Sequence, residues 1–210
     1  MATTFQPIRR SPIHHIHEHH HAQFAEQNGW LVVKAFTGTE SELDAVRKSV
    51  GVCDNSASGK IEVKGKDAAT VAGGLNLSGA KSYRVHDQHF IVIADAASTE
   101  SVTKQLTQAA AGKAGVHVIP NSSSFASFVV VGPNSEKLLR KISGFNFTNL
   151  GTSGHAHGSV ALMHTLIIRS GDRFDLHFPR EFAEYLWEVV LDAGKEFHIH
   201  PFGLETLAKL

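Results

Sequence analysis

The chain has 210 residues, of which 42% are hydrophobic and 19% charged, a composition typical of a soluble globular protein. Its 20 Lys and Arg balance its 20 Asp and Glu, so no net field favours nucleic acid or an acidic membrane surface. A single cysteine, Cys53, excludes an intrachain disulfide and suits a reducing cytoplasm, and we expect neither a membrane span nor a signal peptide.

The N-terminal segment is rich in histidine. Six of the 15 His fall between His14 and His21. Ser11-Pro12 is typical of an N-cap followed by a first helical residue. The helical spacing of apolar residues that follows predicts one helix, which Asn28-Gly29 ends. A strand is predicted next, over residues 30–36.

The following stretch predicts a helix, a tight crossover and a strand. Thr39 and Glu42 have the spacing of a capping box. An apolar stripe follows at i, i+3 and i+7, formed by Leu43, Val46 and Val50. Gly51 stands where a left-handed cap would close the helix. Alternating apolar residues then predict a half-buried strand that ends at Gly65.

Beyond this stretch the element order β-α-β-β-α-β is predicted twice. The first pass covers residues 59–120. The second covers residues 121–210 and includes a long loop over 144–159 and a closing strand over 197–200. We therefore predict an α+β fold of two duplicated split-βαβ units with antiparallel sheets. Residues 1–58 form a third segment that packs on both units.

Several runs resemble one family. They are AVRKSVGVCDNSASGKIEVKGKDA at 45–68, RSGDRFDLHFPREFAEYLWEVVLDAG at 169–194 and PFGLETLAKL at 201–210. These are similar to signature segments of the glycine-cleavage T-protein (aminomethyltransferase) superfamily. The resemblance implies a T-protein-like folate-binding fold and a place in one-carbon metabolism.

The resemblance does not extend to the family's chemistry. The G-G-x-x-D-D strand, whose aspartate faces folate in the family, has no counterpart after the loop at 73–80. Asp175 stands where the family has a pteridine-binding glutamate, and Leu207 where it has an arginine. We expect the family's C-terminal β-barrel to be missing as well. Because acid–base catalysis needs a group within hydrogen-bond reach, these departures predict no catalytic residue.

This pattern resembles the γ subunit of sarcosine oxidase. It implies a cytoplasmic, non-catalytic accessory subunit whose partners are other protein subunits, flavoprotein oxidase subunits among them. Tetrahydrofolate is the ligand that the family implies, and the predicted contacts are Asp175, Asn55, Tyr83 and Arg169. The alternative is a tetrahydrofolate-dependent transferase that has moved its acid–base group elsewhere, to a histidine for example.

A third hypothesis is a zinc-binding protein. His17-Glu18-His19-His20-His21 contains the H-E-x-x-H pattern, and His14 lies on the same predicted flank. Histidines four residues apart on a helix can ligate one metal ion. The simpler interpretation is a solvated His-rich face, because six histidines in eight residues produce such spacings by chance. Cys53 is interpreted as a core residue.

Overall fold

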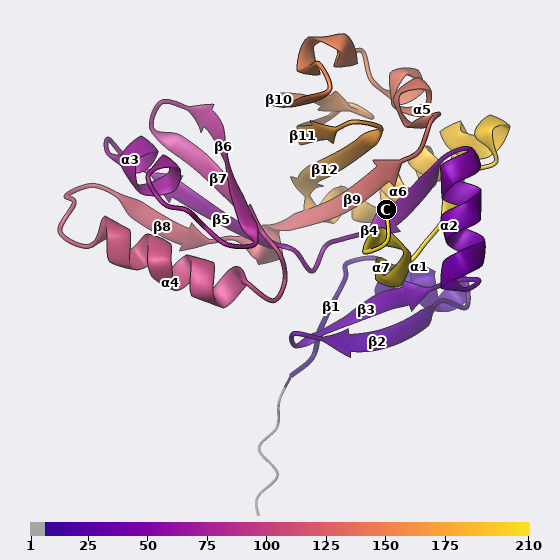
Figure 1. Cartoon of the computed structure of the whole chain (residues 1–210), viewed down its shortest axis with the longest axis horizontal. Coiled ribbons are helices and arrows are strands. Elements are labelled where there is room, and N and C mark those ends of the chain that lie inside the picture. The colour runs from indigo at the N-terminus through magenta and orange to yellow at the C-terminus, as the bar shows by residue number, and fades with distance from the viewer. Residues whose placement is uncertain (1–6) are drawn as a thin grey trace, which may run out of the picture. The chain divides into compact units, whose positions relative to one another are not determined.

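The structure is a computed structural model and describes residues 7–210. These residues form two compact units (Figure 1). One unit is the continuous segment Ser56–Ala126, which we call the inserted unit. The other combines the described residues up to Asn55 with Ser127–Leu210, and we call it the main unit. Within the described residues, no helix is long and apolar enough to cross a membrane.

The inserted unit has the predicted element order. Its elements are β5 (Gly59–Lys64), α3 (Ala68–Gly73), β6 (Ala80–His86), β7 (His89–Ala94), α4 (Thr99–Ala110) and β8 (His117–Pro120). The strands form an antiparallel sheet in the order β6-β7-β5-β8. A 3-10 helix, η1 (Ser122–Ser124), leads out of the sheet.

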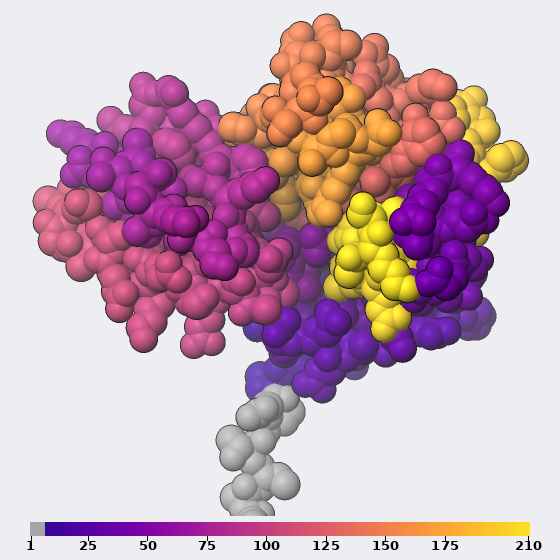
Figure 2. Space-filling model, viewed as in Figure 1, coloured from indigo at the N-terminus to yellow at the C-terminus, as the bar shows by residue number. Residues whose placement is uncertain are grey.

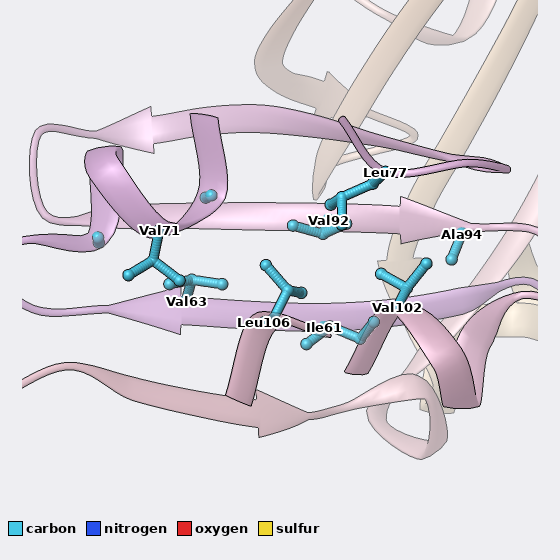
Figure 3. Close-up of a cluster of buried hydrophobic side chains, with 10 residues drawn as sticks. Ile61, Val63, Val71, Leu77, Val92, Ala94, Val102 and Leu106 are labelled. Atoms are coloured by element: carbon cyan, nitrogen blue, oxygen red, sulfur yellow. The ribbon is translucent and has the colours of Figure 1, made fainter. Parts of the chain in front are cut away.

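The core of the inserted unit lies between this sheet and its two helices (Figure 3). Ile61 and Val63 on β5 are fully buried, but Lys60 and Glu62 are buried as well, so the prediction of a half-buried strand is wrong. Val71 of α3 and Leu106 of α4 pack into the same cluster. All residues of this cluster belong to the inserted unit, which therefore has a hydrophobic core of its own. Burying each such side chain stabilises the fold by roughly 1.5–3 kcal/mol.

The main unit contains two sheets. A three-stranded sheet has the order β1-β3-β2, from β1 (Arg9–Arg10), β2 (Gln23–Gln27) and β3 (Trp30–Ala35). A six-stranded sheet has the order β10-β11-β12-β9-β4-β13. Its strands are β4 (Gly51–Asp54), β9 (Phe125–Val131), β10 (Ser153–Val160), β11 (Met163–Ser170), β12 (Arg173–Pro179) and β13 (His200–Pro201).

Helices complete the main unit. They are α1 (His14–His19), α2 (Thr39–Lys48), α5 (Ser135–Ile142), α6 (Ala183–Gly194) and α7 (Leu204–Leu207). Trp187 of α6 is buried against Phe128 of β9, with ring centroids 5.2 Å apart, so α6 covers one face of the large sheet. The C-terminal residues lie against α2 (Figure 2), where Lys209 Nζ is 2.6 Å from Glu40 Oε1.

The N-terminal helix is shorter than predicted. Helix α1 ends at His19, and Phe24 lies in β2. Asn28-Gly29 does not end a helix; it forms the turn between β2 and β3, with φ of 51° and 74°. Asn-Gly is the pair best suited to a two-residue hairpin turn, because both residues tolerate positive φ. The pair therefore indicates a hairpin, and the single-helix prediction is wrong.

Two predictions about α2 are also wrong, although its apolar stripe is confirmed. No side chain caps the helix, and Glu42 does not bond back to Thr39. Gly51 is the first residue of β4, not a left-handed cap. A Cβ there would lie 2.5 Å from Val46 Cγ2 and 2.6 Å from Phe202 Cδ1. The close approach of these side chains, not backbone conformation, is what requires glycine here.

The second half of the chain departs from the predicted order. The predicted loop over 144–159 contains the 3-10 helix η2 (Phe147–Leu150) and strand β10, so three strands, not two, separate α5 from α6. The sequence of β10 is SGHAHGSV, whose Gly and Ala disfavour strands and obscure the alternation. In the predicted strand 197–200, Phe197 ends the 3-10 helix η4 (Lys195–Phe197), and only His200–Pro201 pairs, with β4.

Candidate functional site

The candidate site is the polar face of β12, which carries Arg173, Asp175 and His177. Residues two apart on a strand share a face, and the intervening Phe174 and Leu176 are fully buried on the other side. The Arg173 guanidinium donates to both oxygens of Asp175, with Nη2–Oδ1 at 2.7 Å and Nε–Oδ2 at 2.9 Å. Only 17% of the Asp175 side chain is exposed. A bidentate pair of this kind holds the carboxylate in place and uses much of its capacity to accept hydrogen bonds.

The next polar position on this face is a buried serine–histidine pair. Ser127 Oγ lies 2.6 Å from His177 Nδ1, and the two residues are 1% and 3% exposed. Asn55, at the end of β4, donates its backbone N–H to the Ser127 carbonyl at 2.8 Å. A hydroxyl hydrogen-bonded to an imidazole can act as a nucleophile and its base, but only where a substrate can reach it. At this burial the pair fixes the orientation of the imidazole.

Arg169 does not join this face. It pairs across the β11–β12 ladder with Phe174, and its guanidinium carbon lies 5.0 Å from the centre of the Phe174 ring. Its Nη1 is 2.9 Å from Glu136 Oε2. The structure therefore places Arg169 and Asp175 on opposite faces of the sheet. Tyr83 lies on β6 and belongs to the inserted unit. Of the four predicted ligand contacts, only Asn55 and Asp175 lie on the strands that form this site or directly after one.

The predicted metal ligands are not brought together. Helix α1 ends before His21, which is exposed, so His17 and His21 do not face one another as a helical pair. His17 Nε2 is 2.9 Å from Asp54 Oδ2, and His14 Nε2 is 3.1 Å from Glu18 Oε1. Across residues 7–210, no group of three or more His, Cys, Asp or Glu could hold a metal ion.

Burial, not metal binding, explains the two inner histidines of α1. His17 is 1% exposed and packs edge-on against Trp187, with ring centroids 4.9 Å apart. The Ser11 hydroxyl also donates to Asp54 Oδ2, so one buried carboxylate oxygen accepts from both Ser11 and His17. Burial lowers the pKa of His14, against the opposing effect of Glu18. The simpler prediction, a solvated His-rich face, applies only to the exposed side of the helix, which carries His15 and His19.

Cys53 lies in the core, as predicted. It is fully buried beside Val46, Val129 and Phe202. Burial, with the neighbouring Asp54 charge, raises the pKa of its thiol well above the usual value. A thiol with a raised pKa is a poor nucleophile, because the thiolate is the reactive form.

Three buried polar groups were missed from the sequence: the His17–Asp54 pair, the Ser127–His177 pair and Glu42. The signal for Ser127 was present, since it interrupts the apolar run FASFVVV. Glu42 carried a signal too, but two of its donors, Gly203 and Thr206, come from the far end of the chain. Long-range partners cannot be read from local spacing.

Comparisons with family models, curated proteins and solved structures all point to the same family. The family model described as the GCVT N-terminal domain matches residues 13–78 and 74–210. An aminomethyltransferase of Desulfitobacterium hafniense (strain Y51) is 27% identical over 226 residues, which cover 94% of this chain and 61% of that protein. The chain thus spans about three fifths of the length of the curated relatives it matches.

Two solved structures share the fold. The glycine cleavage system aminomethyltransferase T of Bartonella henselae has a TM-score of 0.81 at 21% identity and covers 95% of this chain and 60% of its own. A chain of the heterotetrameric sarcosine oxidase of Corynebacterium sp. U-96 has a TM-score of 0.67 at 16% identity, with coverage of 90% and 96%. With the family match over nearly the whole chain, these findings show that the protein belongs to the glycine-cleavage T-protein superfamily.

Proposed function

We propose that this protein is a non-catalytic accessory subunit in one-carbon or methylated-amine metabolism. The observation that carries the proposal is the Arg173–Asp175 ion pair. Asp175 occupies the position at which the family resemblance implies a pteridine-binding glutamate, and here both of its oxygens accept from Arg173. A carboxylate held in this way is a poorer acceptor for a ligand than a free one, since the ligand must displace or share the guanidinium.

The partner in this proposal is a flavoprotein oxidase. The sarcosine oxidase whose chain shares this fold is a heterotetramer, which supports assembly with other subunits. The role is then to complete an interface, with the T-protein fold as scaffold and tetrahydrofolate as a weak ligand at most. Folds host unrelated functions, so the fold alone does not supply a transferase activity.

Co-expression tests the proposal. The chain is produced with any flavin-containing oxidase subunits that its source genome encodes, and the mixture is separated by size with absorbance read at the flavin band. We expect the chain to elute with the flavin, and the purified chain to show no aminomethyl transfer to tetrahydrofolate. A chain that elutes alone beside an intact flavoprotein would contradict the accessory role.

A second function is favoured by one observation. His177 lies two residues from Asp175 on the same strand face, and Ser127 fixes its Nδ1. This is an oriented imidazole of the kind that the alternative, a tetrahydrofolate-dependent transferase, requires, and because it is only 3% exposed this alternative also requires that substrate binding open a path to the ring. Calorimetric titration of tetrahydrofolate into the wild type, Asp175→Ala and His177→Gln distinguishes the two. Saturable binding and turnover that His177→Gln abolishes would favour the transferase, whereas no heat in any variant would exclude it.

A further inference from the structure

The outward side of α1 carries a pair of histidines that the buried contacts leave unused. Helix α1 buries His14 and His17, and this turns His15 and His19 towards solvent. Both lie inside the helix, four residues apart, so their side chains stand one above the other on a single face. The Cβ atoms of such a pair are roughly 5–6 Å apart. His15 and His19 therefore share a helical face, whereas His17 and His21 of the H-E-x-x-H pattern do not, because α1 ends before His21.

The chemistry of the pair suits a divalent transition-metal ion. Neutral imidazoles at i and i+4 on a helix are a recurrent two-point ligand set. The His15 side chain is 63% exposed, so its ring can rotate to bring a nitrogen to the ion. His19 is exposed, and its ring lies edge to face with the ring of His20, with centroids 5.7 Å apart. Zn²⁺, Ni²⁺ and Cu²⁺ are the divalent ions that prefer imidazole.

A carboxylate from another helix lies beside this pair. Glu184 Oε2 of α6 is 3.7 Å from His15 Nε2, and its side chain is 60% exposed. A negative charge at this distance attracts a cation, so it favours an ion held at the adjacent His15 ring. Glu184 belongs to α6 and lies 169 residues after His15 in the sequence, so its charge is independent of the histidine-rich run.

We propose that His15 and His19 chelate one Zn²⁺, Ni²⁺ or Cu²⁺ ion on the outer face of α1, with Glu184 as the nearby countercharge and water in the remaining coordination positions. The site has two protein ligands, which agrees with the absence of any three-ligand group among residues 7–210. Because the ion bridges two successive turns of a six-residue helix, its binding stabilises α1.

The test is calorimetric titration of Zn²⁺ into the full chain, purified without an affinity tag and stripped with a chelator. His15→Ala and His19→Ala should each weaken the binding roughly tenfold or more, since either change converts a two-point chelate into a single ligand. The double variant should be no weaker than the weaker single variant, because both rings hold the same ion. Glu184→Gln should cause a smaller loss.

His20→Ala and His21→Ala are the matched controls, since both residues are exposed and belong to the same run. We expect both to bind Zn²⁺ as the wild type does. Circular dichroism confirms that each variant is folded. Losses at His20 or His21 equal to those at His15 and His19 would overturn the proposal, as would additive losses in the double variant or the absence of saturable binding in the wild type.

Discussion

At the scale of single residues, Glu42 holds the two ends of the main unit together. The Glu42 side chain is buried and accepts from the backbone N–H groups of Thr37 at 3.0 Å and Gly203 at 3.0 Å, and from Thr206 Oγ1 at 2.7 Å; Phe36 N–H also donates to it. Burial alone would raise the pKa of this carboxyl, but the hydrogen bonds outweigh burial and lower the pKa. The ionised form is therefore the one that the fold stabilises.

We predict that Glu42→Gln lowers the free energy of unfolding by about 2–4 kcal/mol at pH 7, because a charged acceptor with several donors is lost. The lowered pKa also fixes the pH dependence. Glu42 stabilises the native state above about pH 4.3, the usual pKa of glutamate, and this contribution is lost as pH falls through the native pKa. Urea unfolding at a series of pH values measures both effects. Glu188→Gln, an exposed change on α6, should alter neither.

A second residue-scale prediction concerns the His17–Asp54 pair, whose side chains are 1% and 4% exposed. Removing one partner leaves a buried polar group without its donor or acceptor, so His17→Ala and Asp54→Ala should each cost about 2–4 kcal/mol. In a double-mutant cycle the coupling should be about 1–3 kcal/mol. The exposed Lys195–Asp192 pair serves as the comparison and should show no measurable coupling. Equal coupling in the two pairs would mean that burial does not matter here.

At the scale of elements, local patterning predicted those elements whose residues alternate clearly. Strand β5 and the stripe of α2 have apolar residues at the periods of a strand and a helix, and these apolar residues are buried as predicted, although β5 also buries Lys60 and Glu62. Strand β10 was not predicted, because its His, Gly, Ala and Ser residues give no difference in hydrophobicity between its two faces. The β2–β3 hairpin was not predicted for another reason: the helical spacing of apolar residues indicated one helix, and Asn28-Gly29 was interpreted as its end. The polar face of β12 was predictable from its alternation, whereas the ion pair between Arg173 and Asp175 on that face was not predicted.

The β10–β11 hairpin turns at two residues poorly suited to the conformation. Ala161 and Leu162 have φ of 47° and 65°, and Leu162 is 94% exposed. A left-handed backbone costs roughly 1–2 kcal/mol at a residue with a Cβ. Leu162→Gly should therefore raise the free energy of unfolding by roughly 1 kcal/mol, with little loss of packing because the Leu162 side chain is exposed, whereas Ala161 is buried and is left unchanged. Urea unfolding at neutral pH measures the gain.

The β2–β3 turn supplies the reciprocal control. Asn28-Gly29 already has the residues that its positive φ values favour. Asn28→Ala with Gly29→Leu should lower the free energy of unfolding by a similar amount, roughly 1–2 kcal/mol. If the first exchange failed to stabilise the protein while the second destabilised it, the geometry of the β10–β11 turn would not be a source of strain.

At the scale of the whole molecule, the chain leaves the main unit after Asn55 and returns at Ser127. Strands β4 and β9 are antiparallel neighbours, with Asp54 opposite Phe128. Asn55 N–H donates to the Ser127 carbonyl at 2.8 Å, so the two points of exit and return are adjacent. Sequence patterning placed the predicted boundaries at 58/59 and 120/121 but could not show that β4 and β9 pair, because that pairing spans about 70 residues.

This topology predicts that the inserted unit can be removed. Replacing Ser56–Ala126 by Asn-Gly would convert β4 and β9 into a hairpin with a two-residue turn, the shortest antiparallel connection. Because the main unit keeps its hydrogen bonds across β4–β9 and its buried aromatic cluster, we expect the shortened chain to unfold cooperatively in urea. The excised segment, with its own core between β5, β7, α3 and α4, should fold separately. Dispersed amide spectra of both pieces would establish that each unit carries its own folding information. A molten main unit beside a folded segment would show instead that the main unit depends on the inserted unit for its folding.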